Sequence, residues 1–325
     1  MKRAVVTGPT GAVGRALLDR LLSEGVEVLA ICRPGSLRSA DIPKHPLLTK
    51  AAAGLEDYAA LAEGTGTVGA PWDEPWETFY HLAWEGTTGQ ERNDTSLQLS
   101  NAARTLDAVR LAKRLGCTAF VGAGSQAEYG PFEGRLSPDT PAFPRTGYGV
   151  AKLAAGQMSR LLCSQLGIRH VWVRILSVYG PWDTKNSMVM STLSALFAGK
   201  KPSLTKGGQK WDYLYSEDAA DALYLLGERG QDQKTYCLGS GEAKELREYM
   251  LRIRDAAAEV SGVPKEKLTL GIGELPYAKG QVMNLCADIS DLQRDTGFFP
   301  RCSFEAGIRK TAEFVKRQEE GQKRT

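Results

Sequence analysis

Short apolar runs alternate with longer stretches of helical periodicity through the first half of the chain. The apolar runs predict buried strands at 4–6, 26–32, 47–51, 78–82, 118–123 and 169–175. Apolar positions three and four residues apart predict a helix soon after the first strand and two long helices at 94–115 and 148–166. Repeated strand–helix units of this kind predict a parallel sheet with helices on both faces.

This alternation lapses after Gly180 and Pro181. Shorter strands are expected at 211–215 and 235–238, among helices at 188–198, 217–227 and 243–260. We therefore expect an α/β fold with a doubly wound, Rossmann-type parallel sheet over residues 1–180. Residues 181–325 should mainly form a smaller C-terminal substrate lobe, with room for some segments to return to the first domain.

A glycine-rich turn follows the first predicted strand, in the sequence Thr7-Gly-Pro-Thr-Gly-Ala-Val-Gly14. Strand, glycine turn and helix start form the context in which three glycines indicate a dinucleotide site. Gly8 permits the tight turn, Gly11 lets the backbone approach a pyrophosphate, and Gly14 lets the helix pack on the strand. Free N–H groups at the helix start attract phosphate. We expect cofactor contacts from Gly8, Thr10, Gly11, Ala12 and Val13.

The end of the second predicted strand bears on the choice of cofactor. A carboxylate there would bind the adenosine ribose and favour NAD. This chain instead has Arg33 and Ser36, with Arg38 just beyond. A guanidinium and a hydroxyl suit a 2′-phosphate, so NADP(H) is favoured. If Arg33 only stacks on adenine, NAD(H) is also possible.

Composition narrows the class of protein without naming a function. The 325 residues carry a net charge of +3, too small to indicate nucleic acid or a membrane surface as a partner. Six scattered cysteines form no Cys-x-x-Cys pair, which favours reduced core thiols in a cytoplasmic protein and no metal site. The apolar start is interrupted too early for a signal peptide, and no apolar run reaches membrane-spanning length.

Three distant segments supply candidate catalytic residues. Tyr148 and Lys152 are four residues apart on one face of a predicted helix. An ammonium beside a phenol would lower the pKa of Tyr148 and make it a general acid or base, although Tyr-x-x-x-Lys alone also suits a surface pair. Ser125 ends a predicted strand, where it could bind a substrate oxygen or simply cap a turn. Asn101 lies in an apolar helix pattern, and could equally be a core amide.

Taken together, these motifs resemble the extended short-chain dehydrogenase/reductase family, which contains nucleotide-sugar epimerases, dehydratases and ketoreductases. The resemblance covers nearly the whole chain. It is carried by the glycine loop, Tyr80-His-Leu-Ala-Trp84, Asn101 with Thr105, Ser125-Gln-Ala-Glu-Tyr-Gly130, Tyr148-Gly-Val-Ala-Lys152, Arg174-Ile-Leu-Ser-Val-Tyr-Gly-Pro181 and Trp211-Asp-Tyr-Leu-Tyr-Ser-Glu-Asp218.

The resemblance implies a role for each matching residue. Tyr148 would exchange a proton with the carbinol oxygen, Lys152 would hold the nicotinamide ribose, and Ser125 would bind the same substrate oxygen. Asn101 would support the site, while His81 is expected to be structural. Further cofactor contacts are expected from Leu82, Ala83, Ser177 and Val178, beside Tyr148 and Lys152. Substrate contacts are expected from Trp84, Ser125, Gln126, Tyr179 and Trp211.

Departures from the family pattern reduce the number of reactions that the resemblance implies. The family's dehydratases carry an Asp-Glu pair where this chain has Gln126 and Ala127, and its 3,5-epimerising reductases carry a cysteine at Ala127. Plain hydride transfer remains, either as NADP(H)-dependent reduction at C4 of a nucleotide-activated deoxysugar or as an NAD-dependent 4-epimerisation. A cofactor-sensing binding protein is the non-enzymatic alternative.

Trp211 marks a second departure, because many members have an arginine there that grips the nucleotide diphosphate. The tryptophan could stack on a base or sugar, or fill the core between the lobes. The family also implies a homodimer, formed through the helices that begin near residues 94 and 148.

Overall fold

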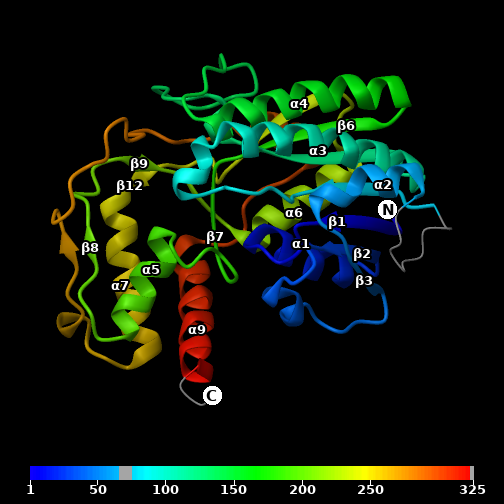
Figure 1. Ribbon diagram of the computed structural model, residues 1–325. Helices are drawn as coiled ribbons and strands as arrows, with labels where there is room; N and C mark the ends of the chain where they lie inside the picture. The colour runs from blue at the N-terminus through cyan, green and yellow to red at the C-terminus, as the bar shows by residue number, and fades with distance from the viewer. Residues whose placement is uncertain (66–74, 323–325) are drawn as a thin grey trace.

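The centre of the molecule is a seven-stranded, wholly parallel sheet (Figure 1). The computed structural model describes residues 1–65 and 75–322. The sheet has the order β11-β6-β5-β4-β1-β2-β3. Its strands are β1 (Arg3–Thr7), β2 (Glu27–Cys32), β3 (Leu48–Ala52), β4 (Thr78–His81), β5 (Ala119–Ser125), β6 (Arg169–Ile175) and β11 (Lys234–Leu238). The predicted Rossmann-type α/β fold is confirmed.

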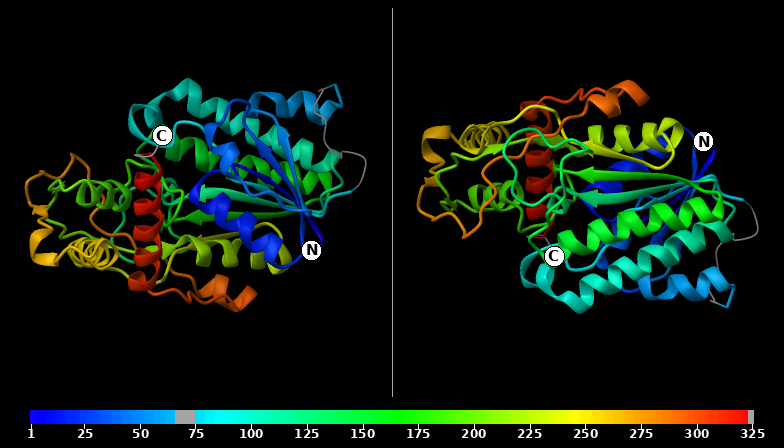
Figure 2. Two further views of the ribbon diagram at one scale, coloured as in Figure 1. Left: turned by 90° about the horizontal axis from the view of Figure 1, so that it is seen from below. Right: turned by 90° about the horizontal axis from the view of Figure 1, so that it is seen from above.

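Helices cover both faces of this sheet, as Figure 2 shows. One face packs on α1 (Ala12–Ser23) and α6 (Ser216–Arg229), whose leucines join the valines of β1 and β2 in one core. The other face packs on α2 (Tyr58–Glu63), α3 (Thr95–Arg114) and α4 (Gly147–Leu166) around a second core. Because both faces are buried, the strands are continuous apolar runs rather than alternating ones.

A second lobe lies beyond the carboxyl ends of the central strands (Figure 2). Its core joins apolar side chains of α5 (Met188–Phe197), α7 (Leu246–Ser261) and α9 (Phe304–Gln322). Short paired strands border it: β8 (Ser203–Leu204) with β13 (Gly271–Ile272), and β9 (Lys210–Trp211) with β12 (Lys244–Glu245). Near the boundary between the lobes, β7 (Ser177–Tyr179) pairs in parallel with β10 (Tyr213–Tyr215). The remaining helix, α8 (Ser290–Thr296), packs on α6.

Segments from the second half of the chain return to the central sheet, as the expected domain division allowed. The strand expected at 235–238 pairs as β11 with β6 at the edge of this sheet, and α6 packs on α1. The strand expected at 211–215 is broken at Asp212. The buried carboxylate of Asp212 accepts hydrogen bonds from the backbone N–H groups of Ser240, Gly241 and Ala287, at 2.7, 3.1 and 3.0 Å. These bonds hold residue 212 between two strands that pair with different partners.

Candidate active site

The glycine turn after β1 leaves the start of α1 open. Gly8 has φ of +67°, and a Cβ there would lie 2.8 Å from the backbone nitrogen of Ala83. A Cβ on Gly14 would lie 2.1 Å from the carbonyl oxygen of Gly8. At Gly11, by contrast, an added Cβ would meet nothing within 4 Å. The first and third glycines therefore allow close packing of the backbone, and the second faces open space, as a phosphate-binding loop requires.

A cavity of about 290 Å³ lies over this turn. The predicted cofactor residues among its lining are Gly8, Thr10, Gly11, Arg33, Ser36, Leu82 and Ala83. Ala12 lines a different cavity, and the side chain of Val13 packs on the core. The residues present thus fit a dinucleotide: a glycine cradle, a helix N-terminus and a cavity at the carboxyl edge of the sheet.

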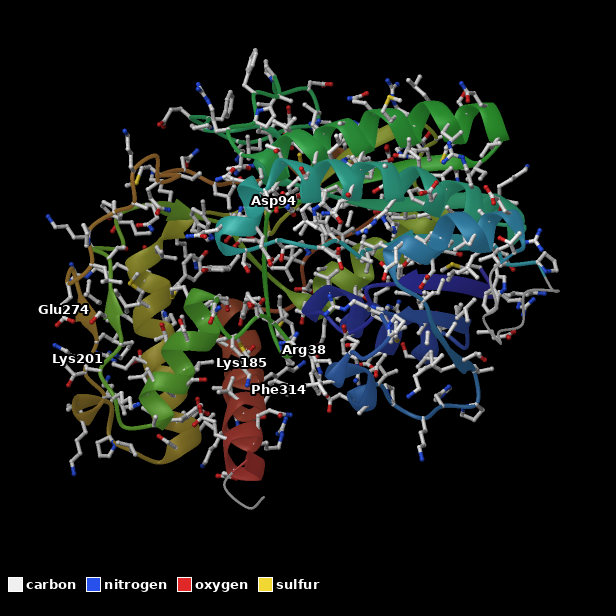
Figure 3. The ribbon with its side chains drawn as sticks, viewed as in Figure 1. Arg38, Asp94, Lys185, Lys201, Glu274 and Phe314 are labelled. Carbon is white, nitrogen blue, oxygen red and sulfur yellow. The ribbon has the colours of Figure 1, made fainter. Side chains whose placement is uncertain are left out.

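The end of this cavity that follows β2 is basic. The Arg33 side chain is 67% exposed, and one of its guanidinium nitrogens is 3.6 Å from a carboxylate oxygen of Glu85. Arg104 holds the other oxygen of Glu85 at 2.9 Å. Arg38, labelled in Figure 3, also lines the cavity and donates a hydrogen bond of 3.1 Å to the carbonyl of Trp182. Glu85 is a carboxylate in this cavity that the sequence reasoning missed.

Thr7 and His81 tie the glycine turn to the loop after β4. The Thr7 hydroxyl accepts hydrogen bonds from the N–H groups of Leu82 and Ala83, each at 3.2 Å. His81 lies between the hydroxyls of Thr7 and Thr105, at 3.1 and 3.3 Å. Burial lowers the pKa of His81 to about 3, so the ring is neutral. His81 is a structural residue here, as expected.

Asn101, on α3, also holds the loop that follows β4. Its Oδ1 accepts a hydrogen bond from the N–H of Glu85 at 3.2 Å, and its Nδ2 donates to the carbonyl of Glu85 at 3.0 Å. The amide thereby fixes the loop that carries Ala83, Trp84 and Glu85 along the cavity. These contacts are those of a core amide bonded to the backbone. Asn101 therefore affects the site by holding this loop in place.

Ser125 and Tyr148 meet at the carboxyl end of β5. Ser125 ends the strand, and Tyr148 lies in the first turn of α4, where it is 9% exposed. The Ser125 hydroxyl accepts a hydrogen bond of 3.2 Å from the N–H of Ala127 and also acts on the phenol of Tyr148. Burial raises the pKa of Tyr148, while Ser125 and the charge of Arg92 act against that rise. Trp84, which lines the cavity over the glycine turn, packs edge-on against Tyr148.

Lys152 directs its ammonium at the backbone and at an aromatic ring. Its Nζ donates to the carbonyl of Ala123 at 2.6 Å and lies 3.8 Å from the centre of the Trp84 ring. The centre of the Tyr148 ring is 5.9 Å away. Burial lowers the pKa of Lys152 to about 7, so near neutrality it is only partly charged. The cation that acts on the pKa of Tyr148 in this structure is Arg92. The role of Lys152 toward the nicotinamide ribose stays a prediction.

The carboxylate of Glu128 holds the backbone of Ser125 in place. This carboxylate is fully buried and lies in the short helix η4 (Gln126–Glu128). It accepts hydrogen bonds from the N–H of Ser125 at 2.8 Å, from Trp172 Nε1 at 3.1 Å and from Arg174 Nε at 2.8 Å. The geometry of the candidate catalytic hydroxyl therefore depends on a buried ion pair. Glu128 belongs to a motif noted in the sequence, but no local pattern singles it out.

Trp211 lines a second cavity of about 360 Å³, in the smaller lobe. Its Nε1 donates a hydrogen bond of 2.9 Å to Ser177 Oγ, which connects this cavity to β7. The indole also packs against two clusters of buried apolar side chains. Trp211 therefore both lines the cavity and contributes to the core. Ser177 and Val178 are half-buried on β7.

The other expected substrate contacts lie apart from this cavity. Gln126 is half-buried directly after Ser125, and Trp84 packs edge-on against Tyr148 with 6.0 Å between ring centres. Tyr179 needs correction as a substrate contact. It is 1% exposed, its hydroxyl donates to the carbonyl of Phe304 at 3.2 Å, and its ring packs in the aromatic core of the second lobe.

Two expected absences concern metals and membranes. Within residues 1–65 and 75–322, no three His, Cys, Asp or Glu side chains are grouped so as to hold a metal ion. Over the same described ranges, no helix is long and apolar enough to cross a bilayer.

The model of the NAD dependent epimerase/dehydratase family matches residues 4–239. The chain belongs to this family. The match runs from β1 to just beyond β11, so it includes the glycine turn, Ser125, Tyr148 and Lys152. The resemblance inferred from the motifs is therefore confirmed at the level of the family.

Individual relatives are more distant. The dTDP-glucose 4,6-dehydratase of Shigella flexneri is 30% identical over 182 residues, which are 55% of this chain and 50% of that protein. The chain thus spans about half the length of this relative. The structure of UDP-N-acetylglucosamine 4-epimerase from Methanobrevibacter ruminantium M1, in complex with UDP-N-acetylmuramic acid, has a TM-score of 0.84 at 21% identity and covers 98% of this chain and 99% of its own. RMD from Pseudomonas aeruginosa, complexed with NADPH, has a TM-score of 0.79 at 19% identity, with 98% of each chain covered.

Arg92 is a further residue beside Tyr148 that no sequence motif indicated. Arg92 lies in η3 (Gly89–Asn93), with its guanidinium carbon 4.2 Å from the centre of the Tyr148 ring. Arg92 lies in an irregular, polar segment, so no hydrophobic periodicity in the sequence pointed to it. Only the packing of η3 against the start of α4 brings it to the phenol.

Proposed function

We propose that this protein catalyses hydride transfer at C4 of a nucleotide-activated deoxysugar, as an NADP(H)-dependent ketoreductase. The observation that carries the proposal is that Ser125 and Tyr148 come together at the carboxyl end of β5, where Trp84 of the cavity lining packs against Tyr148. When bound, the dinucleotide supplies the hydride. Ser125 polarises the substrate carbonyl, and Tyr148 gives its phenolic proton to the oxygen as the carbon is reduced.

The basic end of the cavity supports NADP(H). Arg33 is largely exposed and Ser36 lines the same wall, so a guanidinium and a hydroxyl are available to a 2′-phosphate. The carboxylate of Glu85 would repel that phosphate, but Arg104 already neutralises it at 2.9 Å. The related structure of RMD from Pseudomonas aeruginosa is complexed with NADPH.

The cavity at Trp211 supports a nucleotide-sugar substrate. It lies in the second lobe and connects through Ser177 to the strand that would face the nicotinamide. The relative from Methanobrevibacter binds a UDP-sugar in the same fold. Water elimination needs an acid and a base beside the reacting sugar. Gln126 and Ala127 supply neither, which favours plain hydride transfer over dehydration.

A 4-epimerase that retains NAD(H) is the second candidate. Its support is the near-complete structural overlap with a UDP-N-acetylglucosamine 4-epimerase. The same Ser125 and Tyr148 would first remove and then return the proton of the C4 hydroxyl, with the transient ketone reduced on its other face.

We also propose a cytoplasmic homodimer formed through α3 and α4. These helices pack side by side and expose Leu99 at 71%, Val150 at 54%, Met158 at 52% and Leu161 at 52%. A row of exposed apolar side chains on neighbouring helices is typical of a surface that another molecule covers. All six cysteines are unpaired thiols, five of them buried, in agreement with a reducing compartment.

One experiment separates the reductase from the epimerase. The purified protein is analysed for retained dinucleotide and then mixed with UDP- and dTDP-linked 4-keto and 4-hydroxy sugars, with NADPH or NADH in separate series. NADPH consumption with a 4-keto sugar supports the reductase. Retained NAD and interconversion of 4-epimers without net cofactor consumption support the epimerase. If neither reaction occurs with any of these sugars, the proposal of hydride transfer at C4 is wrong.

A further inference from the structure

We propose that Arg92 is a positioning residue whose fixed positive charge stabilises the phenolate form of Tyr148. The inference deepens the proposed function, since it rests on Tyr148 as the acid or base of the reaction. Its geometric basis is the guanidinium over the face of the phenol ring, at 4.2 Å from the ring centre.

Arg92 is held in this place by its own segment. Its Nη1 donates a hydrogen bond of 2.7 Å to the carbonyl of Thr87. Asn93, the next residue, accepts a hydrogen bond of 3.1 Å from the N–H of Gly147 at the start of α4. A Cβ on Gly147 would lie 3.2 Å from the carbonyl oxygen of Arg92. The segment that carries the cation is therefore packed directly on the helix turn that carries the phenol; Figure 3 labels Asp94, which joins η3 to α3.

The charged and polar groups around Tyr148 come from every element packed on it. Ser125 of β5 lowers the pKa of the phenol, and Glu128 of η4 raises it by its negative charge. Lys152 of α4 lies 5.9 Å from the ring centre, with its ammonium directed at Ala123 and Trp84. Among the residues that the structure describes, Arg92 is the cation that combines closeness to the ring with a charge that no ordinary pH removes.

The two cations near Tyr148 thus differ in kind. Burial lowers the pKa of Lys152 to about 7, so its charge varies across the range in which an enzyme of this family would work. A guanidinium stays protonated. A cation is attracted to a neutral aromatic face, but more strongly to a phenolate, so Arg92 favours ionisation of Tyr148. It acts against the burial that raises the pKa of this phenol.

The test measures the ionisation of Tyr148 directly. The full-length protein is labelled with tyrosine carrying 13C at Cζ, and the Tyr148 resonance is assigned by its absence in Y148F. We expect its midpoint to lie about one pH unit higher in R92Q than in the wild-type protein, because an opposite charge at 4–6 Å lowers the pKa of an acid by about 1 to 3. R92K should restore most of the wild-type midpoint.

A matched control separates charge from packing. N93A removes the hydrogen bond from η3 to Gly147 but keeps the Arg92 charge, so its Tyr148 midpoint should stay close to that of the wild type. An equal midpoint in R92Q and wild type, or an equal rise in N93A and R92Q, would overturn the proposal. The titration needs no substrate, so its failure counts against Arg92 alone. A normal titration in a protein that reduces or epimerises no sugar counts against the proposed function.

Discussion

Removal of the Glu128 carboxylate should destabilise the protein more than any single charge removal at the surface. The Glu128 and Arg174 side chains are 1% and 6% exposed, and Nε of Arg174 is 2.8 Å from the carboxylate. Loss of one partner of a buried pair typically costs about 3–5 kcal/mol, because the other charge stays buried without compensation. Glu128→Ala also leaves the N–H groups of Ser125 and Trp172 without their acceptor. We therefore expect a loss near the upper end, about 5 kcal/mol.

Graded variants show where this loss comes from. Glu128→Gln keeps one carbonyl oxygen for Ser125 but no charge for Arg174, so it should cost about 2–3 kcal/mol. Adding Arg174→Met to Glu128→Gln should recover part of that loss, because the unpaired guanidinium is removed with its partner. Asp107→Ala, which breaks the more exposed pair with Arg110, is the control and should cost less than about 1 kcal/mol.

Urea-induced unfolding at pH 7, followed by circular dichroism, measures these differences. The reasoning is refuted if Glu128→Ala loses no more stability than Asp107→Ala, or if the double variant is less stable than Glu128→Gln.

Three further predictions concern the cofactor and substrate sites. The pKa of Lys152 is about 7 in the folded protein and near 10.4 in the unfolded chain, so the unfolded state binds more protons between these values and the stability of the wild-type protein rises with pH across that window. The melting temperature of Lys152→Met should therefore exceed that of the wild type at pH 7, and this difference should vanish by pH 10. A difference that stays constant with pH would contradict the lowered pKa of Lys152. Arg33→Ala should weaken NADPH binding about 10- to 100-fold and leave NADH nearly unchanged by fluorescence titration, whereas equal losses would mean that Arg33 stacks on adenine. Trp211→Ala should raise the substrate KM with NADPH affinity unchanged; a drop in melting temperature with an unchanged KM would place Trp211 in the core alone.

Features set by local sequence could be predicted well. The glycine turn, the strands of the central sheet and the long helices α3 and α4 depend on short-range periodicity and on residues with special backbone freedom. Ser125 and Tyr148 were expected to act on one substrate oxygen because the family resemblance implies it.

Features set by packing could not be predicted. No local pattern shows that residues 234–238 return to the edge of the sheet, or that Asp212 breaks a strand by accepting three backbone hydrogen bonds. Tyr179 was expected at the substrate because its motif is there, but the aromatic core of the second lobe buries it. The direction of the Lys152 ammonium and the approach of Arg92 to Tyr148 depend on side-chain geometry, which motif spacing does not contain.

The central claim is that Tyr148 transfers the proton in a hydride-transfer reaction at a sugar carbon. Tyr148→Phe removes only the phenolic oxygen, and Tyr224→Phe, on α6, serves as its control. Turnover of the sugar found in the substrate screen should fall about 100-fold or more in Tyr148→Phe, the usual scale for a positioned acid, with the Kd of the dinucleotide nearly unchanged. Near-normal turnover in a folded Tyr148→Phe protein would contradict the account.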